Sequence, residues 1–359
     1  MDKIKVGIIG ATGMVGQRFL LLLENHPYFE VSALAASSHS AGKTYEEAVG
    51  NRWKMTTPLP DKYKAMVVSD ASDVGAMAGK VNFVFCAVDD RNKQEICELE
   101  EAYAKAEIPV VSNNSANRWT PDVPMIIPEI NSSHVKLIEV QKKRLGTNRG
   151  FIAVKPNCSI QAYTAAITPL LKYKPTQIVV TTYQAVSGAG RTLSEWPEME
   201  DNVIPFISGE EEKSENEPLK IWGEIKNGAV IKANAPLITS QCIRVPVSNG
   251  HMSAVFVKFA NKPSKEEILK AWHDFSGKPQ ELALPSAPRQ FITYFNEDNR
   301  PQTRIDRNIY NGMGISVGRL REDTMFDYKF VCLSHNTLRG AAGGGVLCAE
   351  LLYKLGYLG

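Results

Sequence analysis

The residue best suited to covalent chemistry is Cys158, in the segment VKPNCS at 154–159. Turn-forming residues flank this cysteine, and a helix is predicted over Gln161–Leu171 directly behind it. A thiol at the start of a helix has its thiolate stabilised by the helix dipole, and a thiolate is a usable nucleophile at neutral pH. Four other cysteines stand in apolar runs and are expected to be small buried residues: Cys86, Cys97, Cys332 and Cys348. The pattern therefore predicts Cys158 as the nucleophile.

A thiol nucleophile needs a base, and His251 is the histidine best placed to serve. It stands in SNGHM at 248–252, at the mouth of a strand predicted over Ala254–Phe259. The end of a strand beside a glycine should present its side chain to a cleft. Position alone leaves two interpretations open, a catalytic base and an ordinary histidine at a strand end.

Three glycines, Gly10, Gly13 and Gly16, lie between a predicted strand, Lys5–Ile9, and a predicted helix, Val15–Leu23. Glycine permits a tight turn and a close approach of backbone N–H groups to a diphosphate. The helix start adds unpaired donors and a partial positive charge. The strand before and the helix after favour dinucleotide binding over a plain turn. The residues expected at this loop are Gly10, Ala11, Thr12, Gly13, Met14 and Val15.

The end of the second predicted strand, Val31–Ala36, bears on the choice of dinucleotide. Enzymes that use NAD usually place an Asp or Glu there to bind the ribose 2′-hydroxyl. This chain instead has hydroxyl groups and a lysine, and Glu30 precedes the strand at the far end of the sheet. That composition suits the 2′-phosphate of NADP, with an ordinary serine-rich turn as the alternative. The residues expected to contact it are Ser37, Ser38, Ser40 and Lys43.

The first 150 residues alternate short apolar runs with helical patterns, which predicts βαβ units and a doubly wound parallel sheet. The predicted strands are Lys5–Ile9, Val31–Ala36, Val81–Val88 and Pro109–Ser112, and the predicted helices are Val15–Leu23 and Glu95–Ala106.

After about residue 150 the strands lengthen and fewer helices separate them, which predicts an α+β unit around a mixed or antiparallel sheet. The predicted strands are Gln177–Ala185, Ala254–Phe259 and Phe326–Leu333, and the predicted helices are Gln161–Leu171 and Lys265–Phe275. A closing helix predicted over Gly340–Leu355 should pack back on the first unit. The charged run GEEEKSENE at Gly209–Glu217 is most simply a solvated loop. We therefore expect a nucleotide-binding domain at 1–157, completed by 337–359, and a second domain at 158–336.

The overall composition narrows the class of protein. The 359 residues, 39.6 kDa, are enough for two domains with sizeable cores. Lysine and arginine number 41 against 39 acidic residues, and a net charge of +2 argues against a nucleic-acid partner. We see no apolar window that predicts a membrane span and no signal peptide pattern, so we expect no membrane partner and a cytoplasmic location. Six scattered cysteines without a CxxC pair predict neither disulfides nor a metal site.

Five segments, in this order, resemble the aspartate-β-semialdehyde dehydrogenase family: GATGMVGQRF, KPNCS, YQAVSGAG, RVPVSNGHM and NTLRGAAGG. The resemblance covers nearly the whole chain, and ASSHSAGK and GAAGGG are most similar to the archaeal and fungal branch. It implies an α/β protein with an N-terminal Rossmann-like doubly wound sheet and an α+β catalytic and dimerisation domain. It also implies the reversible, NADPH-dependent reductive dephosphorylation of L-aspartyl-4-phosphate to L-aspartate 4-semialdehyde, which serves lysine, threonine and methionine biosynthesis.

The same resemblance implies roles for the catalytic residues. Cys158 would attack the acyl carbon and form an acyl-thioester, and His251 would be the general acid/base. Gln184 would orient the substrate, and Asn157 would shape the site of the acyl oxygen, where a tetrahedral oxyanion develops.

Binding residues are implied by the match as well. Arg244 would clamp the substrate carboxylate, and Glu210 would meet its amine, although the register among the consecutive glutamates at 210–212 stays open. Lys213 would bind the phosphate, which reverses the loop interpretation of the charged run. Arg118 would join it there, with a surface arginine capping a loop as the alternative. The nicotinamide side would be lined by Ser187, Gly188, Ala189, Gly190 and Asn336.

Two other functions stay open. A malonyl-CoA reductase of the same fold also uses an acyl-thioester cysteine with NADPH, but its substrate has no amine for Glu210 to meet. A non-catalytic NADP-binding regulator would have lost the nucleophile or the base, and both residues are present. The resemblance, together with β-branched strands such as Gln177–Thr182, predicts a homodimer or a tetramer made of two dimers.

Overall fold

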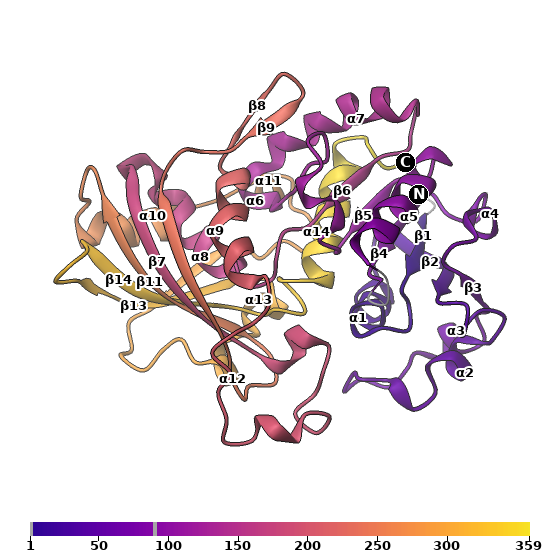
Figure 1. Cartoon of the computed structure of the whole chain (residues 1–359), viewed down its shortest axis with the longest axis horizontal. Coiled ribbons are helices and arrows are strands. Elements are labelled where there is room, and N and C mark those ends of the chain that lie inside the picture. The colour runs from indigo at the N-terminus through magenta and orange to yellow at the C-terminus, as the bar shows by residue number, and fades with distance from the viewer. Residues whose placement is uncertain (1–2, 89–91) are drawn as a thin grey trace.

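Two six-stranded sheets organise the chain, whose computed structural model describes residues 3–88 and 92–359 (Figure 1). In the first sheet all neighbouring strands run parallel, in the order β3-β2-β1-β4-β5-β6. This confirms the predicted doubly wound parallel sheet, whose strand order reverses between β1 and β4. Its strands are β1 (Ile4–Ile9), β2 (Phe29–Ala36), β3 (Val68–Asp70), β4 (Phe83–Cys86), β5 (Val110–Ser112) and β6 (Ile152–Val154).

Close backbone contacts shape the glycine loop that follows β1. Gly10 has a φ of +83°, and a Cβ there would lie 2.2 Å from the carbonyl oxygen of Ala87. A Cβ on Gly16 would lie 2.2 Å from the carbonyl oxygen of Gly10. Neither position has room for a side chain, so glycine is required at both. The loop therefore holds the start of α1 (Met14–Leu23) at the point where the strand order reverses.

The closing helix α14 (Ala342–Lys354) returns to the first sheet, as predicted, and packs against α1 and β5 (Figure 1, yellow). Its Leu347 and Leu351 belong to the same apolar core as Phe19 of α1. The chain therefore leaves the first unit, builds the second and comes back. The other helices of the first unit are α2 (Tyr45–Val49), α3 (Asp61–Lys64), α4 (Val74–Met77), α5 (Lys93–Lys105), α6 (Pro128–Asn131) and α7 (Leu137–Leu145).

The second sheet is mixed, in the order β10-β7-β11-β14-β13-β12. Its outer pairs β10–β7 and β12–β13 are parallel, and its inner pairs are antiparallel. The strands are β7 (Pro175–Gln184), β10 (Leu237–Arg244), β11 (His251–Phe259), β12 (Ile292–Phe295), β13 (Ile315–Glu322) and β14 (Tyr328–Ser334), with a separate hairpin of β8 (Glu224–Lys226) and β9 (Ala229–Ile231). The helices are α8 (Gln161–Ile167), α9 (Glu210–Ile221), α10 (Lys265–Asp274), α11 (Lys278–Glu281), α12 (Thr303–Asp306) and α13 (Ile309–Gly312).

The two faces of the second sheet differ in burial. Ile178 and Val180 of β7 are buried beneath the face that α8 covers, opposite Val257 and Val255 of β11. The alternate residues of the same strands, among them Tyr183 at 37% exposure, point to the other face, where they are only partly covered. Side chains alternate between the faces of a strand, so one subunit leaves one face of this sheet incompletely buried.

Two predicted elements differ from the structure. The helix predicted over Gln161–Leu171 ends at Ile167 and continues as a 3-10 helix, because Pro169 has no N–H to continue the α-helical pattern. The charged run predicted as a solvated loop forms the first turns of α9, which begins after Gly209 at φ +70°. Glu210 and Glu217 on that helix are buried, so only part of the run faces solvent.

Within residues 3–88 and 92–359, no helix combines the length and the apolar character needed to cross a membrane. Over the same ranges, no group of three or more His, Cys, Asp or Glu side chains could hold a metal ion. The six cysteines are all unpaired thiols.

Candidate active site

A cavity of about 380 Å³ lies where the carboxyl ends of the first sheet meet the loops of the second unit. The carboxyl ends of parallel strands meet at one edge, so residues that follow β1, β4, β5 and β6 come together there. Eleven of the predicted site residues line this cavity: Met14, Val15, Arg118, Asn157, Cys158, Ser187, Gly188, Gly190, Glu210, Lys213 and Asn336.

Cys158 lies at the cavity wall, in the loop between β6 and α8. Asn157 Oδ1 accepts hydrogen bonds from the backbone N–H and the hydroxyl of Ser159, both at 2.7 Å. Gln161 Nε2 donates to the carbonyl oxygen of Asn157 at 3.0 Å. A Cβ on Gly340 would lie 2.7 Å from the Cβ of Cys158, so the glycine segment before α14 packs directly on this loop. The half-buried thiol is therefore held in a defined position.

The electrostatic surroundings of the thiol oppose its ionisation. Burial first, and then the carboxylate of Glu210, raise the pKa of Cys158 above its ordinary value. Lys155, Arg118 and Arg244 act in the opposite direction but do not outweigh burial. Burial thus opposes the ionisation that the start of a helix is expected to favour, because the charged form of the thiol loses hydration.

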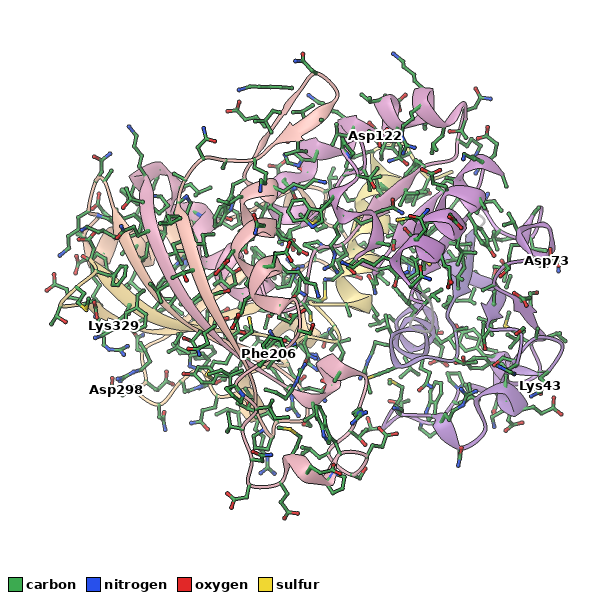
Figure 2. The ribbon with its side chains drawn as sticks, viewed as in Figure 1. Lys43, Asp73, Asp122, Phe206, Asp298 and Lys329 are labelled. Atoms are coloured by element: carbon green, nitrogen blue, oxygen red, sulfur yellow. The ribbon has the colours of Figure 1, made fainter. Side chains whose placement is uncertain are left out.

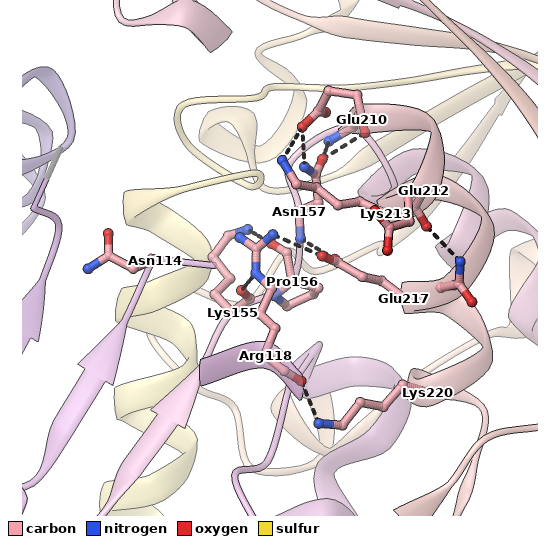
Figure 3. Close-up of polar contacts among 12 residues, drawn as sticks. Asn114, Arg118, Lys155, Pro156, Asn157, Glu210, Glu212, Lys213, Glu217 and Lys220 are labelled. Carbon is pink, nitrogen blue, oxygen red and sulfur yellow. Dashed lines mark hydrogen bonds and ion pairs between the residues drawn. The ribbon is translucent and has the colours of Figure 1, made fainter. Parts of the chain in front are cut away.

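Glu210, the first residue of α9, is a buried carboxylate that accepts from three side chains (Figure 3). Its Oε1 accepts from Asn157 Nδ2 at 2.9 Å and from Lys213 Nζ at 2.8 Å, and its Oε2 accepts from Gln184 Nε2 at 3.2 Å. Burial acts to raise the pKa of Glu210, but Lys213 and these hydrogen bonds hold it below its ordinary value. Glu210 is thus the one of the three consecutive glutamates that places a charged carboxylate in this cavity.

His251, the first residue of β11, is fully buried, so the prediction that it faces an open cleft is wrong. The N–H of Ala185 donates to its Nδ1 at 3.1 Å, so the neutral ring carries its hydrogen on Nε2. Burial, and next Arg244, lower the pKa of His251 to about 3, which keeps the ring neutral. Nε2 has no hydrogen-bond partner among the described residues. An unpaired N–H is therefore available to donate.

Gly188 lines the cavity and packs directly against His251 and Arg244. A Cβ on Gly188 would lie 3.0 Å from His251 Nε2 and 2.9 Å from Arg244 Nη1. Arg244 ends β10, is buried, and donates from Nη1 to the carbonyl oxygen of Ala185 at 2.6 Å. Because position 188 has no side chain, both groups lie close to the backbone of a cavity-lining residue.

Arg118 lies in a 3-10 turn after β5 and is buried, so the alternative of a surface arginine is wrong. Its Nη1 pairs with Glu217 Oε1 at 2.9 Å, and its Nε donates to the carbonyl oxygen of Lys155 at 3.0 Å. The other oxygen of Glu217 accepts from the N–H of Asn157 at 2.6 Å. One carboxylate therefore contacts both the arginine and the loop of the nucleophile (Figure 3).

A tight turn after β7 forms another wall of the cavity. Asn336 Nδ2 donates to Ser187 Oγ at 2.8 Å, and Asn336 Oδ1 accepts from the N–H of Gly250 at 2.8 Å. Asn336 thus ties this turn to the segment just before β11. Gly190 ends the turn at φ +69°, and of the four predicted residues in it Ala189 does not line the cavity.

The glycine loop fits the diphosphate of a dinucleotide. The N–H groups of Gly10 and Ala11 donate to the carbonyl oxygen of Ala35 at 2.9 and 3.0 Å, and Thr12 accepts from the side chain of Gln17. Gly13 caps α1 without a side-chain hydrogen bond, so backbone N–H groups of the first turn are left for a ligand. A side chain at Gly10 would collide with the backbone, which keeps this surface bare.

The structure does not bring the predicted serine turn into the cavity. Ser37 is half-buried, Ser40 is buried, and Ser38 and Lys43 are exposed beyond the end of β2. Figure 2 shows Lys43 at the outer edge of the first unit. Strand β2 neighbours β1, so the turn lies next to the glycine loop, on the side away from Cys158. Glu30 lies inside β2, at its opposite end.

Sequence reasoning missed eight residues of the cavity: Val88, Ile96, Asn113, Asn114, Ser115, Thr337, Gly340 and Ala341. Asn113 to Ser115 follow β5 directly, and a position at the carboxyl end of a parallel strand was a usable signal. The buried Glu100 accepts from Asn114 Nδ2 at 3.2 Å and from Asn117 Nδ2 at 2.7 Å. This carboxylate shapes the loop that carries Arg118.

Two family models match successive parts of the chain. Residues 5–138 match the NAD binding domain of semialdehyde dehydrogenase, and residues 167–339 match its dimerisation domain.

Individual relatives extend over the full chain. An aspartate-semialdehyde dehydrogenase of Methanothermobacter thermautotrophicus is 42% identical, covering 98% of this chain and 99% of its own, and one of Aspergillus fumigatus is 41% identical, covering 99% of each. A crystal structure of aspartate semialdehyde dehydrogenase with NADP from Candida albicans superimposes with a TM-score of 0.87 at 36% identity, covering 99% of this chain and 100% of that one. With archaeal and fungal relatives that match it from end to end, the chain belongs to the aspartate-semialdehyde dehydrogenase family.

Proposed function

We propose that this enzyme catalyses the reversible, NADPH-dependent reductive dephosphorylation of L-aspartyl-4-phosphate to L-aspartate 4-semialdehyde. The observation that carries the proposal is the charged Glu210 carboxylate in the same cavity as Cys158 and Arg118. An aspartyl phosphate presents an ammonium, an acyl carbon and a phosphate, which match these three groups in turn. The relatives that align over the full chain are named aspartate-semialdehyde dehydrogenases, and one solved relative contains NADP.

Cys158 is the proposed nucleophile. Its sulfur attacks the acyl carbon, a carbon–sulfur bond forms, and the bond to the phosphate oxygen breaks. The thiol proton passes to the departing phosphate, which leaves with the electron pair as hydrogen phosphate. The nicotinamide, when bound, supplies the hydride that reduces the acyl-thioester. Collapse of the resulting oxyanion restores the carbonyl and returns the electron pair to the Cys158 sulfur.

His251 and Asn157 are proposed to serve the acyl oxygen. The Nε2–H of His251 is buried and unpaired, which suits donation to an oxygen that gains negative charge. As the neutral ring already holds that hydrogen, His251 begins this direction as a hydrogen-bond donor to the acyl oxygen. Asn157 is held by Glu210 and Ser159, and its loop presents the adjacent sulfur.

The binding roles follow from charge and place. We propose that Glu210 binds the substrate ammonium and that Gln184, its hydrogen-bond partner, orients both. Arg118 and Lys213, which line the cavity, bind the phosphate. Arg244, which packs against the cavity-lining Gly188, binds the substrate carboxylate.

We propose NADP as the cofactor, with its diphosphate on the loop of residues 10–15 and its 2′-phosphate near Ser37, Ser38, Ser40 and Lys43. The nicotinamide would lie against the turn Ser187–Gly190 and Asn336, beside Cys158. A nucleotide-binding domain of residues 1–157 and 337–359 and a catalytic domain of residues 158–336 fit this division of labour, because α14 packs on the first sheet.

The dimerisation-domain match supports a homodimer. A tetramer made of two such dimers and a place in lysine, threonine and methionine biosynthesis are finer proposals that rest on the family resemblance.

The test is to assay the enzyme with each of the two candidate substrates, aspartate semialdehyde and malonyl-CoA. Aspartate semialdehyde, NADP and phosphate should give NADPH, and omission of phosphate should stop the reaction. Malonyl-CoA with NADPH is the parallel reaction, and oxidation of NADPH there without turnover of aspartate semialdehyde would contradict the proposal.

Glu210→Gln sharpens the same test. A hydrogen bond to a charged group is worth about 1.5–3 kcal/mol, so kcat/KM for aspartate semialdehyde should fall roughly 10–150-fold. The KM for NADP should hardly change, because Glu210 lies on the substrate side. Glu211→Gln is the matched control on the next residue. Unchanged turnover in Glu210→Gln would remove the ammonium contact from the proposal.

A further inference from the structure

Four charged residues form one stripe along α9: Glu210, Lys213, Glu217 and Lys220. Their spacing of three, seven and ten residues places them on one face of the helix. The first two line the cavity, and the other two lie farther along the helix, facing the segment of Arg118 (Figure 3). The proposed mechanism uses only the first pair.

Glu217 is the most enclosed carboxylate of this stripe, with no exposed surface. Its Oε1 accepts from Arg118 Nη1 at 2.9 Å, and its Oε2 accepts from the N–H of Asn157 at 2.6 Å. Each oxygen thus contacts a different part of the site, the arginine at one end and the residue before Cys158 at the other.

The arginine is held from further sides. Arg118 Nε donates to the carbonyl oxygen of Lys155 at 3.0 Å. Lys220 Nζ, one stripe position after Glu217, donates to the carbonyl oxygen of Arg118 at 2.5 Å and to that of Val123 at 3.4 Å. Backbone and side chain of Arg118 are therefore both fixed against α9.

A buried ion pair is weak support for stability, because desolvating two charges offsets most of their attraction. A carboxylate that joins two functional segments has another use, which is to fix their relative position. A small displacement of a group that binds substrate is costly to the reaction.

We propose that Glu217 is a positioning residue that sets the Arg118 guanidinium at the distance from Cys158 that the substrate phosphate requires. This rests on the proposed function, in which Arg118 binds that phosphate. Glu217 itself need not touch the substrate.

The test is Glu217→Gln, measured as phosphate-dependent oxidation of aspartate semialdehyde by NADP. A glutamine can accept from one of the two donors but faces the other with its own N–H₂ group, so Glu217→Gln no longer holds Arg118 and the loop of Cys158 in one fixed arrangement. The KM for phosphate should rise about 10–100-fold, as expected for the loss of a hydrogen bond to a charged group, whereas the KM for NADP stays unchanged. A role in folding alone would not single out phosphate.

The opposite sign is also physically possible and would overturn the proposal. Glu217 neutralises part of the arginine charge, so its removal would strengthen phosphate binding if charge outweighed position. A lower or unchanged KM for phosphate in folded Glu217→Gln therefore contradicts the inference. Glu212→Gln is the matched control, since it removes the same charge from an exposed position of the same helix and should behave like the wild type.

A double-mutant cycle identifies the route of the effect. If Glu217 acts through Arg118, Glu217→Gln should add little to the phosphate KM of Arg118→Gln, and fully additive effects would overturn the inference. Glu217→Asp, which keeps the charge, gives the same readout at smaller size should the glutamine variant fail to fold. If the wild-type enzyme shows no phosphate-dependent turnover, both the proposed function and this inference are wrong. If the wild type turns over normally and the Glu217 variants do not behave as expected, only the inference is wrong.

Discussion

At the scale of single residues, the thiol of Cys158 is hard to ionise, but the charges around it would change when substrate binds. Burial and Glu210 raise the pKa of Cys158, while Lys155, Arg118 and Arg244 oppose them. A substrate ammonium beside Glu210 would neutralise the carboxylate that disfavours the thiolate. Substrate binding would then promote ionisation of the thiol where it is needed.

Replacement of the thiol tests the nucleophile directly. Cys158→Ala should abolish turnover and leave NADP affinity nearly intact, because the thiol is not one of the groups proposed to bind the dinucleotide. Fluorescence titration with NADPH gives the affinity, and the phosphate-dependent assay gives the rate. Turnover within a few-fold of the wild type would show that another group attacks the substrate.

The buried imidazole gives a pH prediction. The pKa of His251 is lowered to about 3, so the ring is neutral at any pH well above that value and becomes charged only as the pH falls toward it. An acid limb of kcat/KM near pH 6–7 should therefore not originate from His251. His251→Asn should lower the rate roughly 10²–10⁴-fold, the range for a general acid or base. An acid limb that disappears in His251→Asn would contradict this assignment.

At the scale of elements, strand ends and one helix assemble the site. Position after a strand or before a helix was enough to find Cys158 and the glycine loop, because the doubly wound pattern fixes where such ends meet. The burial of His251 could not be predicted, since it depends on contacts made only in the folded state, among them that with Gly188, 63 residues earlier in the chain.

The burial of one face of α9 was not predicted, although the sequence contained a signal for it. A run of glutamates and lysines is typical of solvated segments, and the burial of Glu217 depends on two partners, Arg118 and Asn157, that lie far away in the chain. The spacing from Glu210 to Glu217 was a usable signal, because it repeats one helical face. The high local charge density therefore led to the wrong prediction of a solvated loop, whereas the helical spacing of the charges would have predicted a helix with one distinct face.

The turn after β2 carries the prediction on cofactor choice. Ser38 is exposed beside the end of the strand that adjoins the glycine loop, so Ser38→Asp should be tolerated by the fold. A carboxylate there would repel a 2′-phosphate and accept from a free 2′-hydroxyl, so the ratio of kcat/KM for NADP over NAD should fall. An unchanged ratio would mean that the turn does not face the adenosine ribose.

At the scale of the whole molecule, the second sheet is covered unevenly. One face packs on α8, while the other leaves Tyr183 of β7 and Phe256 of β11 partly covered in a single subunit. Two cavity-lining residues contact this sheet: Glu210 accepts from Gln184 at the end of β7, and Gly188 packs against His251 at the start of β11. Association through the open face would therefore brace the strands that carry these residues.

The mass of the active enzyme in solution tests that association. We expect light scattering at micromolar concentration to give twice the subunit mass of 39.6 kDa, or four times if two dimers join. Val179→Asp places a charge on the open face, opposite Phe256, and should shift the mass toward a single subunit, because an unpaired charge is costly to bury between subunits. Val67→Asp puts the same charge on an exposed valine of the first unit and should leave the mass unchanged. Circular dichroism of both variants checks that each is folded. A wild-type enzyme that is active at the mass of one subunit would rule out this interface, and an unshifted mass in folded Val179→Asp would move the contact to another surface.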